Sequence, residues 1–199
     1  MDVGGEFPDD AIAAVKMGTT VATNALLERK GARVLLLITK GFADLLRIGY
    51  QTRPDLFALH IRRPDLLYEQ VAELDERLDA EGNVLEPLDE ETARAALLSA
   101  YDAGIRAVAI AGLHAYLNPA HEARVAEIAR EIGFSQVSAS HEVSKLAKLV
   151  GRGDTTVVDA YLSPILRRYV DQVAGALDLG RACERLLFMQ SNGGLTDAR

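Results

Sequence analysis

Cysteine, positive charge and long apolar runs are all scarce in this sequence. Cys183 is the single cysteine among 199 residues, so no internal disulfide can form, which is typical of a reducing compartment. No activating base stands beside Cys183, and we expect an idle thiol. No stretch approaches the ~20 apolar residues of a membrane helix, and the acidic N-terminus lacks the apolar run of a signal peptide. We therefore expect a soluble, cytoplasmic protein.

The charge balance is acidic, with 22 lysines and arginines against 29 aspartates and glutamates and a formal net charge of −7. Binding along nucleic acid or an anionic membrane needs a basic face, so we expect neither partner. A local basic site for a small anion remains open.

Three histidines are candidate ligands: His114 follows a predicted strand, His121 lies on the helix after Pro119, and His141 ends a predicted strand. Their spacing matches no metal-ligand pattern, and we predict no metal site. Because His114 and His141 each follow a predicted strand, they could approach one ligand pocket, but a structural hydrogen-bonding role is favoured.

The apolar pattern predicts alternating helices and buried strands. Short continuous apolar runs are typical of strands buried on both faces, and glycines stand where helices should end. A turn at Glu81-Gly82-Asn83 predicts a hairpin over residues 68–88, and a proline- and arginine-rich surface excursion precedes it. The predicted elements are helices at 20–30, 42–49, 89–104 and 118–133, strands at 32–39, 106–112, 134–143 and 185–190, a loop at 144–153, and a long helix from Asp154 that Pro164 kinks or divides.

This alternation predicts an α/β fold with a mostly parallel or mixed sheet flanked by helices and a β-hairpin excursion. We expect residues 1–11 to be a flexible linker and 12–199 to form one region. The last predicted strand runs into a glycine turn and the chain stops soon after. We interpret the chain as a fragment of a longer polypeptide.

The first candidate site is Gly18-Thr19-Thr20, which precedes the first helix. Free backbone N–H groups, a glycine that permits close approach and two hydroxyls suit an anion or carbonyl ligand. Asn24 lies one turn on from Thr20, on the same face. The competing interpretation, favoured by spacing alone, is that Thr19 or Thr20 is an ordinary N-cap.

Two further segments combine glycine with polar groups. Arg152-Gly153-Asp154-Thr155 reads as a loop entering a helix, with an arginine able to grip a carboxylate or phosphate; Asp154 could equally be a plain N-cap. Ser191-Asn192-Gly193 follows a strand, where open α/β sheets bind ligands, but an ordinary turn fits equally well.

Several long strings resemble one family. MGTTVATNALLERKG, RVLLLITKGFADLLRIGYQTRPDLF, RGDTTVVDAYLSPILRRYV and FMQSNGGL are similar to the hydantoinase A/5-oxoprolinase family, from about Ile12 onward, and the 5-oxoprolinase branch is the more similar. The resemblance implies a partial actin-like/RNase H-like ATPase scaffold. It also implies ATP-driven opening of a cyclic amide such as 5-oxoproline, in glutathione turnover, with Mg²⁺ bridging the phosphates.

The same resemblance implies roles for the candidate residues. Thr19, Thr20 and Asn24 would contact substrate or γ-phosphate, and the other two segments would support that site. Family members carry an Asp-Gly-Gly-Thr type phosphate loop, where this chain has Glu6 instead of a threonine, so we expect an incomplete ATP site and no bound cofactor.

We therefore expect the isolated chain to be inactive, with the rest of the polypeptide or a hydantoinase B-like partner completing the enzyme, and we expect self-association through exposed edges. An N-methylhydantoinase subunit and a non-catalytic binding module are the alternatives.

Overall fold

The computed structural model describes residues 12–51, 57, 59–60, 65–177, 184–190 and 193–197. The predicted linker at 1–11, much of the arginine-rich excursion, Cys183, Ser191 and Asn192 lie outside them. The chain divides into two compact units, one of residues 31–164 and one of residues 1–30 with 165–199. No helix in the described part is long and apolar enough to cross a membrane.

The larger unit is built on a four-stranded parallel sheet of order β3-β2-β6-β7. Every residue of β2 and β6 is buried, as their continuous apolar runs predicted. The strands are β2 (Val34–Thr39), β3 (Gln70–Leu74), β6 (Ala107–Ala111) and β7 (Gln136–Ala139).

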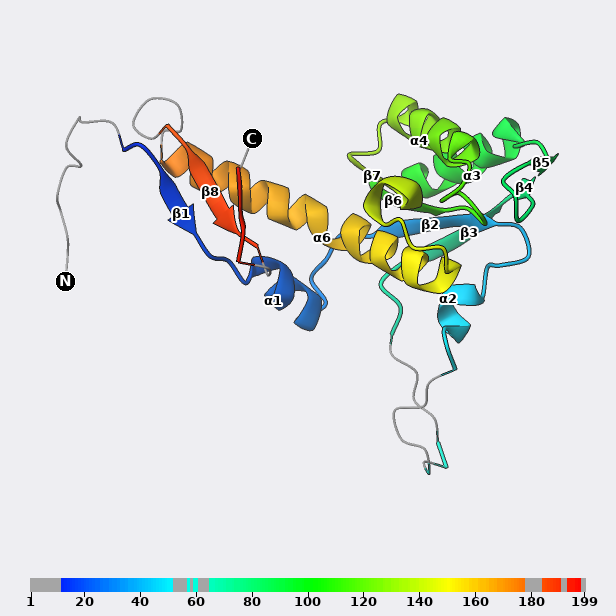
Figure 1. Ribbon diagram of the computed structural model, residues 1–199, viewed down its shortest axis with the longest axis horizontal. Helices are drawn as coiled ribbons and strands as arrows, with labels where there is room; N and C mark the ends of the chain where they lie inside the picture. The colour runs from blue at the N-terminus through cyan, green and yellow to red at the C-terminus, as the bar shows by residue number, and fades with distance from the viewer. Residues whose placement is uncertain are drawn as a thin grey trace. The chain divides into compact units, whose positions relative to one another are not determined.

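Helices cover both faces of this sheet. Figure 1 shows α3 and α4 on one face and the first part of α6 on the other. Asp89 caps α3 by accepting hydrogen bonds from two backbone N–H groups of its first turn, as predicted. Gly133 ends α4 in the left-handed conformation, φ 108°, also as predicted. The helices are α2 (Leu45–Ile48), α3 (Glu90–Asp102), α4 (Ala120–Ile132), α5 (Ser140–Val143) and α6 (Leu149–Ala176).

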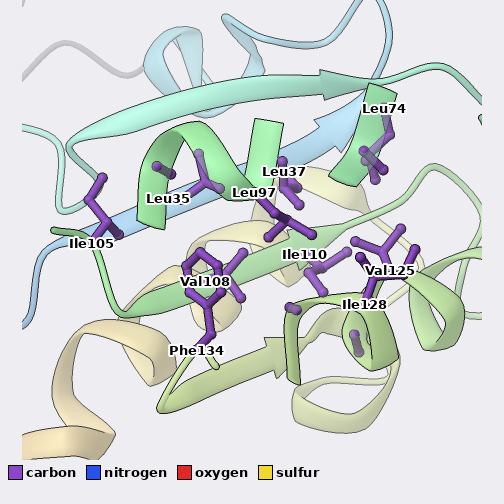
Figure 2. Packing of buried hydrophobic residues seen from close by; sticks show 14 residues of the cluster. Leu35, Leu37, Leu74, Leu97, Ile105, Val108, Ile110, Val125, Ile128 and Phe134 are labelled. Carbon is purple, nitrogen blue, oxygen red and sulfur yellow. The ribbon is translucent and has the colours of Figure 1, made fainter. Parts of the chain in front are cut away.

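The main core lies between the sheet and the α3–α4 layer. Alternate residues of β2 and β6 point into it and meet apolar side chains of the two helices (Figure 2). The leucine, isoleucine and valine side chains that β2, β6, α3 and α4 contribute to it are fully buried. They are Leu35, Leu37, Val108 and Ile110 from the strands and Leu97, Val125 and Ile128 from the helices.

Three local predictions were wrong. The first arm of the predicted hairpin is β3, which pairs in parallel with β2; the antiparallel hairpin is the shorter β4 (Arg77–Leu78) with β5 (Val84–Glu86). The predicted strand 134–143 ends at Ala139, where α5 begins. The last five residues of the predicted loop 144–153 are helical, because α6 begins at Leu149. Pro164 lies inside this single helix and does not divide it.

The smaller unit has a three-stranded sheet of order β1-β8-β9. β1 (Val15–Met17) and β9 (Leu195–Asp197) were not predicted, whereas β8 (Leu186–Met189) was. β1 and β8 are parallel, and β9 returns antiparallel to β8. Helix α1 (Val21–Leu27) follows β1, and the later part of α6 completes the unit.

Candidate functional site

Gly18 and Gly193, from two of the predicted site segments, both follow strands that end at the carboxyl edge of the small sheet. Because β1 and β8 are parallel with Met17 beside Phe188, the residues after both strands emerge at the same edge. Gly18 begins the first of these segments, and nothing lies within 4 Å of a side chain placed there. The second is a turn in which Gly193 has φ +81°, a conformation that favours glycine.

The first segment presents its polar side chains to solvent. The Thr19 hydroxyl accepts a hydrogen bond from the Val21 N–H at 3.2 Å. Thr20 makes no capping bond through its side chain, and the Asn24 amide donates to its hydroxyl at 3.5 Å. Thr20 and Asn24 are exposed. The Thr19 hydroxyl is thus occupied by a backbone hydrogen bond. Thr20 and Asn24 are the side chains of this segment most available to a ligand.

Arg152 lies in the larger unit and is fully buried. Its guanidinium donates to the Gly112 carbonyl at 2.5 Å, the Ser140 hydroxyl at 2.8 Å, and the Leu146 and Ala147 carbonyls at 2.8 and 3.0 Å. Burial lowers the pKa of Arg152 from its usual value. These bonds tie the first turn of α6 to the ends of β6 and β7, so the arginine holds the protein's own backbone.

Asp154 and Thr155 follow Arg152 within α6 and are both exposed. The Thr155 hydroxyl donates to the Gly151 carbonyl at 2.8 Å. Partial removal from water raises the pKa of the Asp154 carboxyl. These residues form a polar surface on α6 of the larger unit.

A buried carboxylate organises the carboxyl edge of the large sheet. Glu122, on α4, is 1% exposed. It accepts hydrogen bonds from the Gly112 N–H and the Ser140 hydroxyl, both at 2.6 Å, and from the His141 N–H at 3.0 Å. Nδ1 of His141 lies 2.6 Å from the same carboxylate. We call Gly112, Glu122, Ser140, His141 and Arg152 the edge network.

A second carboxylate–histidine pair lies at the same edge. Glu76, also 1% exposed, contacts Nδ1 of His121 at 2.8 Å and accepts a hydrogen bond from the Thr39 hydroxyl. Thr39, at the end of β2, in turn accepts from the Leu113 N–H at 2.7 Å. The structural hydrogen bond favoured for His141 is therefore present, and His121 makes the same kind of contact. The ring of His114 instead lies 6.2 Å, between centroids, from that of Tyr116. Within the described residues, no three histidine, cysteine, aspartate or glutamate side chains gather as metal ligands.

Sequence reasoning singled out the histidines and Arg152 but missed Glu76, Glu122 and Ser140. Ser140 and Glu76 could have been found in the sequence, because each is a polar residue just after a strand. Glu122 resembled an ordinary acidic residue of a first helical turn, so its burial was visible only in three dimensions.

Comparison with known proteins gives the family. A family model described as the hydantoinase/oxoprolinase N-terminal region matches residues 3–133, and a second, described as hydantoinase/oxoprolinase, matches residues 152–199. The chain belongs to the hydantoinase/oxoprolinase family. The resemblance seen in the sequence strings is thereby confirmed.

Individual relatives agree with this family. The chain is 43% identical to 5-oxoprolinase 1 of Arabidopsis thaliana, covering 96% of this chain and 16% of that protein. It is 41% identical to 5-oxoprolinase of Saccharomyces cerevisiae, covering 94% and 16%. The chain therefore spans about a sixth of the length of these relatives.

A solved structure carries the same fold. The ATP-dependent caprolactamase of Pseudomonas jessenii superposes with a TM-score of 0.86 at 31% identity, over 98% of this chain and 30% of that one. A nucleotide-free acetone carboxylase gives 0.80 at 25% identity, over 92% and 28%. The predicted α/β architecture with parallel and mixed sheets is confirmed.

Proposed function

We propose that the polypeptide containing this chain couples ATP cleavage to the hydrolytic opening of a cyclic amide, with 5-oxoproline as the first candidate substrate. The observation that carries the proposal is the 43% identity to a 5-oxoprolinase over 96% of this chain. The likeness to an ATP-dependent caprolactamase supports it independently, because caprolactam is also a cyclic amide.

The chemistry explains why ATP is needed. A lactam carbon is a poor electrophile, because the ring nitrogen donates electrons into the carbonyl. Transfer of the γ-phosphoryl group to the amide oxygen turns that oxygen into part of a leaving group. Water then attacks the carbon, and the ring C–N bond breaks, so that the amine leaves and an acyl phosphate remains. A second water hydrolyses this acyl phosphate to the carboxylate and free phosphate. With 5-oxoproline the balance is 5-oxoproline, ATP and two water molecules giving glutamate, ADP and phosphate.

Within this chain, the carboxyl edge of the small sheet is the proposed contact with substrate or γ-phosphate. The exposed Thr20 and Asn24 supply a hydroxyl and an amide, and open space at Gly18 suits a phosphoryl group at close range. Thr19 supports the turn. Ser191, Asn192 and Gly193 are proposed to line the same edge.

The larger unit contributes a supporting surface in this proposal. Arg152 holds the start of α6 in place, and Asp154 and Thr155 present polar groups from the same turn. Mg²⁺ would supply charge neutralisation of the phosphates in the full-length enzyme. We further propose a cytoplasmic location and an actin-like ATPase scaffold. The remaining polypeptide or a hydantoinase B-like partner would complete the enzyme, so that the isolated chain is inactive.

The test uses the full-length polypeptide with 5-oxoproline, caprolactam and N-methylhydantoin, measuring ADP and the ring-opened product. We expect ATP-dependent glutamate formation from 5-oxoproline. Thr20→Ala should lower kcat on the order of 10²-fold, the loss typical of one stabilising hydrogen-bond donor. Thr23→Ala, an exposed threonine of the same helix, is the matched control and should retain full activity.

Turnover of N-methylhydantoin alone would instead assign the sibling N-methylhydantoinase activity. Absence of ATP-dependent ring opening with all three amides would refute the proposal and leave a non-catalytic module.

A further inference from the structure

The His141 imidazole has one nitrogen anchored and the other directed to solvent. Nδ1 lies 2.6 Å from the buried Glu122 carboxylate. The Glu142 carboxylate lies 3.9 Å from Nε2, which is within ion-pair distance when the ring is charged but beyond hydrogen-bond range. Within the described residues no buried side-chain nitrogen or oxygen lacks a hydrogen-bond partner. Since Nε2 has none, this nitrogen must reach the surface.

The edge network fixes the state of that ring. The carboxylate needs a donor at Nδ1, so Nδ1 carries a proton in both the neutral and the charged ring. The hydrogen bond that Nδ1–H of His141 donates to Glu122 is the main cause that raises the pKa of His141 above its usual 6.5. The ring is therefore held in one orientation, and in its charged form it offers an Nε2–H donor to solvent.

The charges around His141 leave this edge locally positive. The buried Glu122 and Arg152 carry opposite charges, and the exposed Glu142 offsets a charged His141 ring. The buried Glu76 beside His121 adds one negative charge at the same edge. The loop that follows α5 adds two exposed lysines, Lys145 and Lys148. This positive region belongs to a chain of net charge −7.

We propose that the carboxyl edge of the β3-β2-β6-β7 sheet carries an oxyanion-binding site centred on Nε2 of His141, with Lys145 and Lys148 as supporting charges. The ligand class is a phosphoryl or carboxylate group, whose oxygen accepts the Nε2–H bond. The position is the one where open parallel sheets bind ligands, and the preformed ring orientation avoids an ordering cost on binding.

The test follows the His141 ring of the 199-residue chain by ¹H–¹⁵N NMR during titration with inorganic phosphate and, separately, with sodium acetate, at constant ionic strength. We expect saturable shifts of the His141 ring. Because only the charged ring binds, affinity should weaken ~10-fold per pH unit above the His141 pKa. A response to phosphate alone identifies a phosphoryl ligand, and a response to both identifies a general oxyanion site.

Charge variants distinguish binding at this site from non-specific electrostatic attraction of phosphate to the protein. Glu142→Gln removes the opposing carboxylate and should tighten phosphate binding by about twofold to fivefold, and Lys148→Gln should weaken it to a similar extent. Lys16→Gln, an exposed lysine of β1 in the other unit, is the charge-matched control and should leave binding unchanged.

An unmoved His141 ring at saturating phosphate would overturn the proposal, as would equal weakening by Lys16→Gln and Lys148→Gln. Because this titration uses the 199-residue chain, its failure is distinct from a failed ring-opening assay on the full-length polypeptide.

Discussion

Replacing Glu122 by glutamine should be among the most damaging single-atom changes in this chain. One carboxylate oxygen accepts from the Gly112 N–H and the Ser140 hydroxyl, and the other accepts from the His141 N–H and faces its Nδ1. Glutamine keeps only one acceptor oxygen. Whichever way its amide is turned, the NH₂ group then faces two donors.

The expected loss of stability follows from the number of donors that no longer have an acceptor. Two donors in a buried site lose their acceptor, at about 1–3 kcal/mol each. The buried Arg152 also loses its counter-charge, and breaking a buried pair costs about 3–5 kcal/mol. These losses overlap because the groups form one network, so we expect Glu122→Gln to lower the free energy of unfolding by about 3–5 kcal/mol. The melting temperature should fall by on the order of 10 °C.

The assay is urea unfolding of the 199-residue chain at neutral pH, followed by far-UV circular dichroism. Glu127→Gln is the matched control, because Glu127 lies on the same helix with its side chain 61% exposed and pairs only with Arg124. This exposed pair should contribute less than about 1 kcal/mol. A Glu122→Gln protein within about 1 kcal/mol of the unmodified chain would refute the reasoning that this carboxylate organises the edge.

Three further predictions concern stability. Gly31→Ala should lower the free energy of unfolding by at least about 1–3 kcal/mol, because its new methyl group would lie 2.0 Å from the Tyr161 ring. Gly175→Ala is the control and should be neutral or stabilising, since nothing lies within 4 Å of a methyl group there. Equal urea midpoints for the two variants would contradict this prediction. The raised pKa of His141 stabilises the fold fully below the unfolded value of 6.5, and this contribution is lost as pH rises through the folded pKa; His141→Gln should flatten that part of the stability–pH curve. Asp89→Ala should cost about 1 kcal/mol through its lost helix cap, measured by thermal unfolding, and an unchanged melting temperature would show that the two capping bonds contribute little.

The parts of the fold that the sequence predicted are those in which local pattern and tertiary environment agree. β2 and β6 are continuous apolar runs because helices cover both faces of their sheet. β1 and β9 are three-residue strands in which no residue is buried, so no apolar run marks them. Both depend on pairing with β8, which is far from β1 in the sequence although close to β9.

The start of α6 was missed for a different reason. Gly151 and Gly153 are poor helix formers, and with Arg152 between them they read as a loop. A side chain at Gly153 would meet the Leu46 side chain of α2 at 3.0 Å, so the glycine lets α2 pack closely against α6. Tertiary packing therefore overrides the local preference at this point, and a single sequence contains no sign of it.

The burial of Arg152 changes the interpretation of this residue as a ligand-binding group. An arginine in an exposed glycine loop would be free to grip a phosphate, but within α6 its guanidinium reaches four backbone and side-chain acceptors of its own unit. Releasing it to a ligand would leave those buried acceptors unpaired, at about 1–3 kcal/mol each. Ligand binding at this edge is therefore better served by groups that already face solvent, such as Nε2 of His141, while Arg152 keeps the surrounding backbone in place.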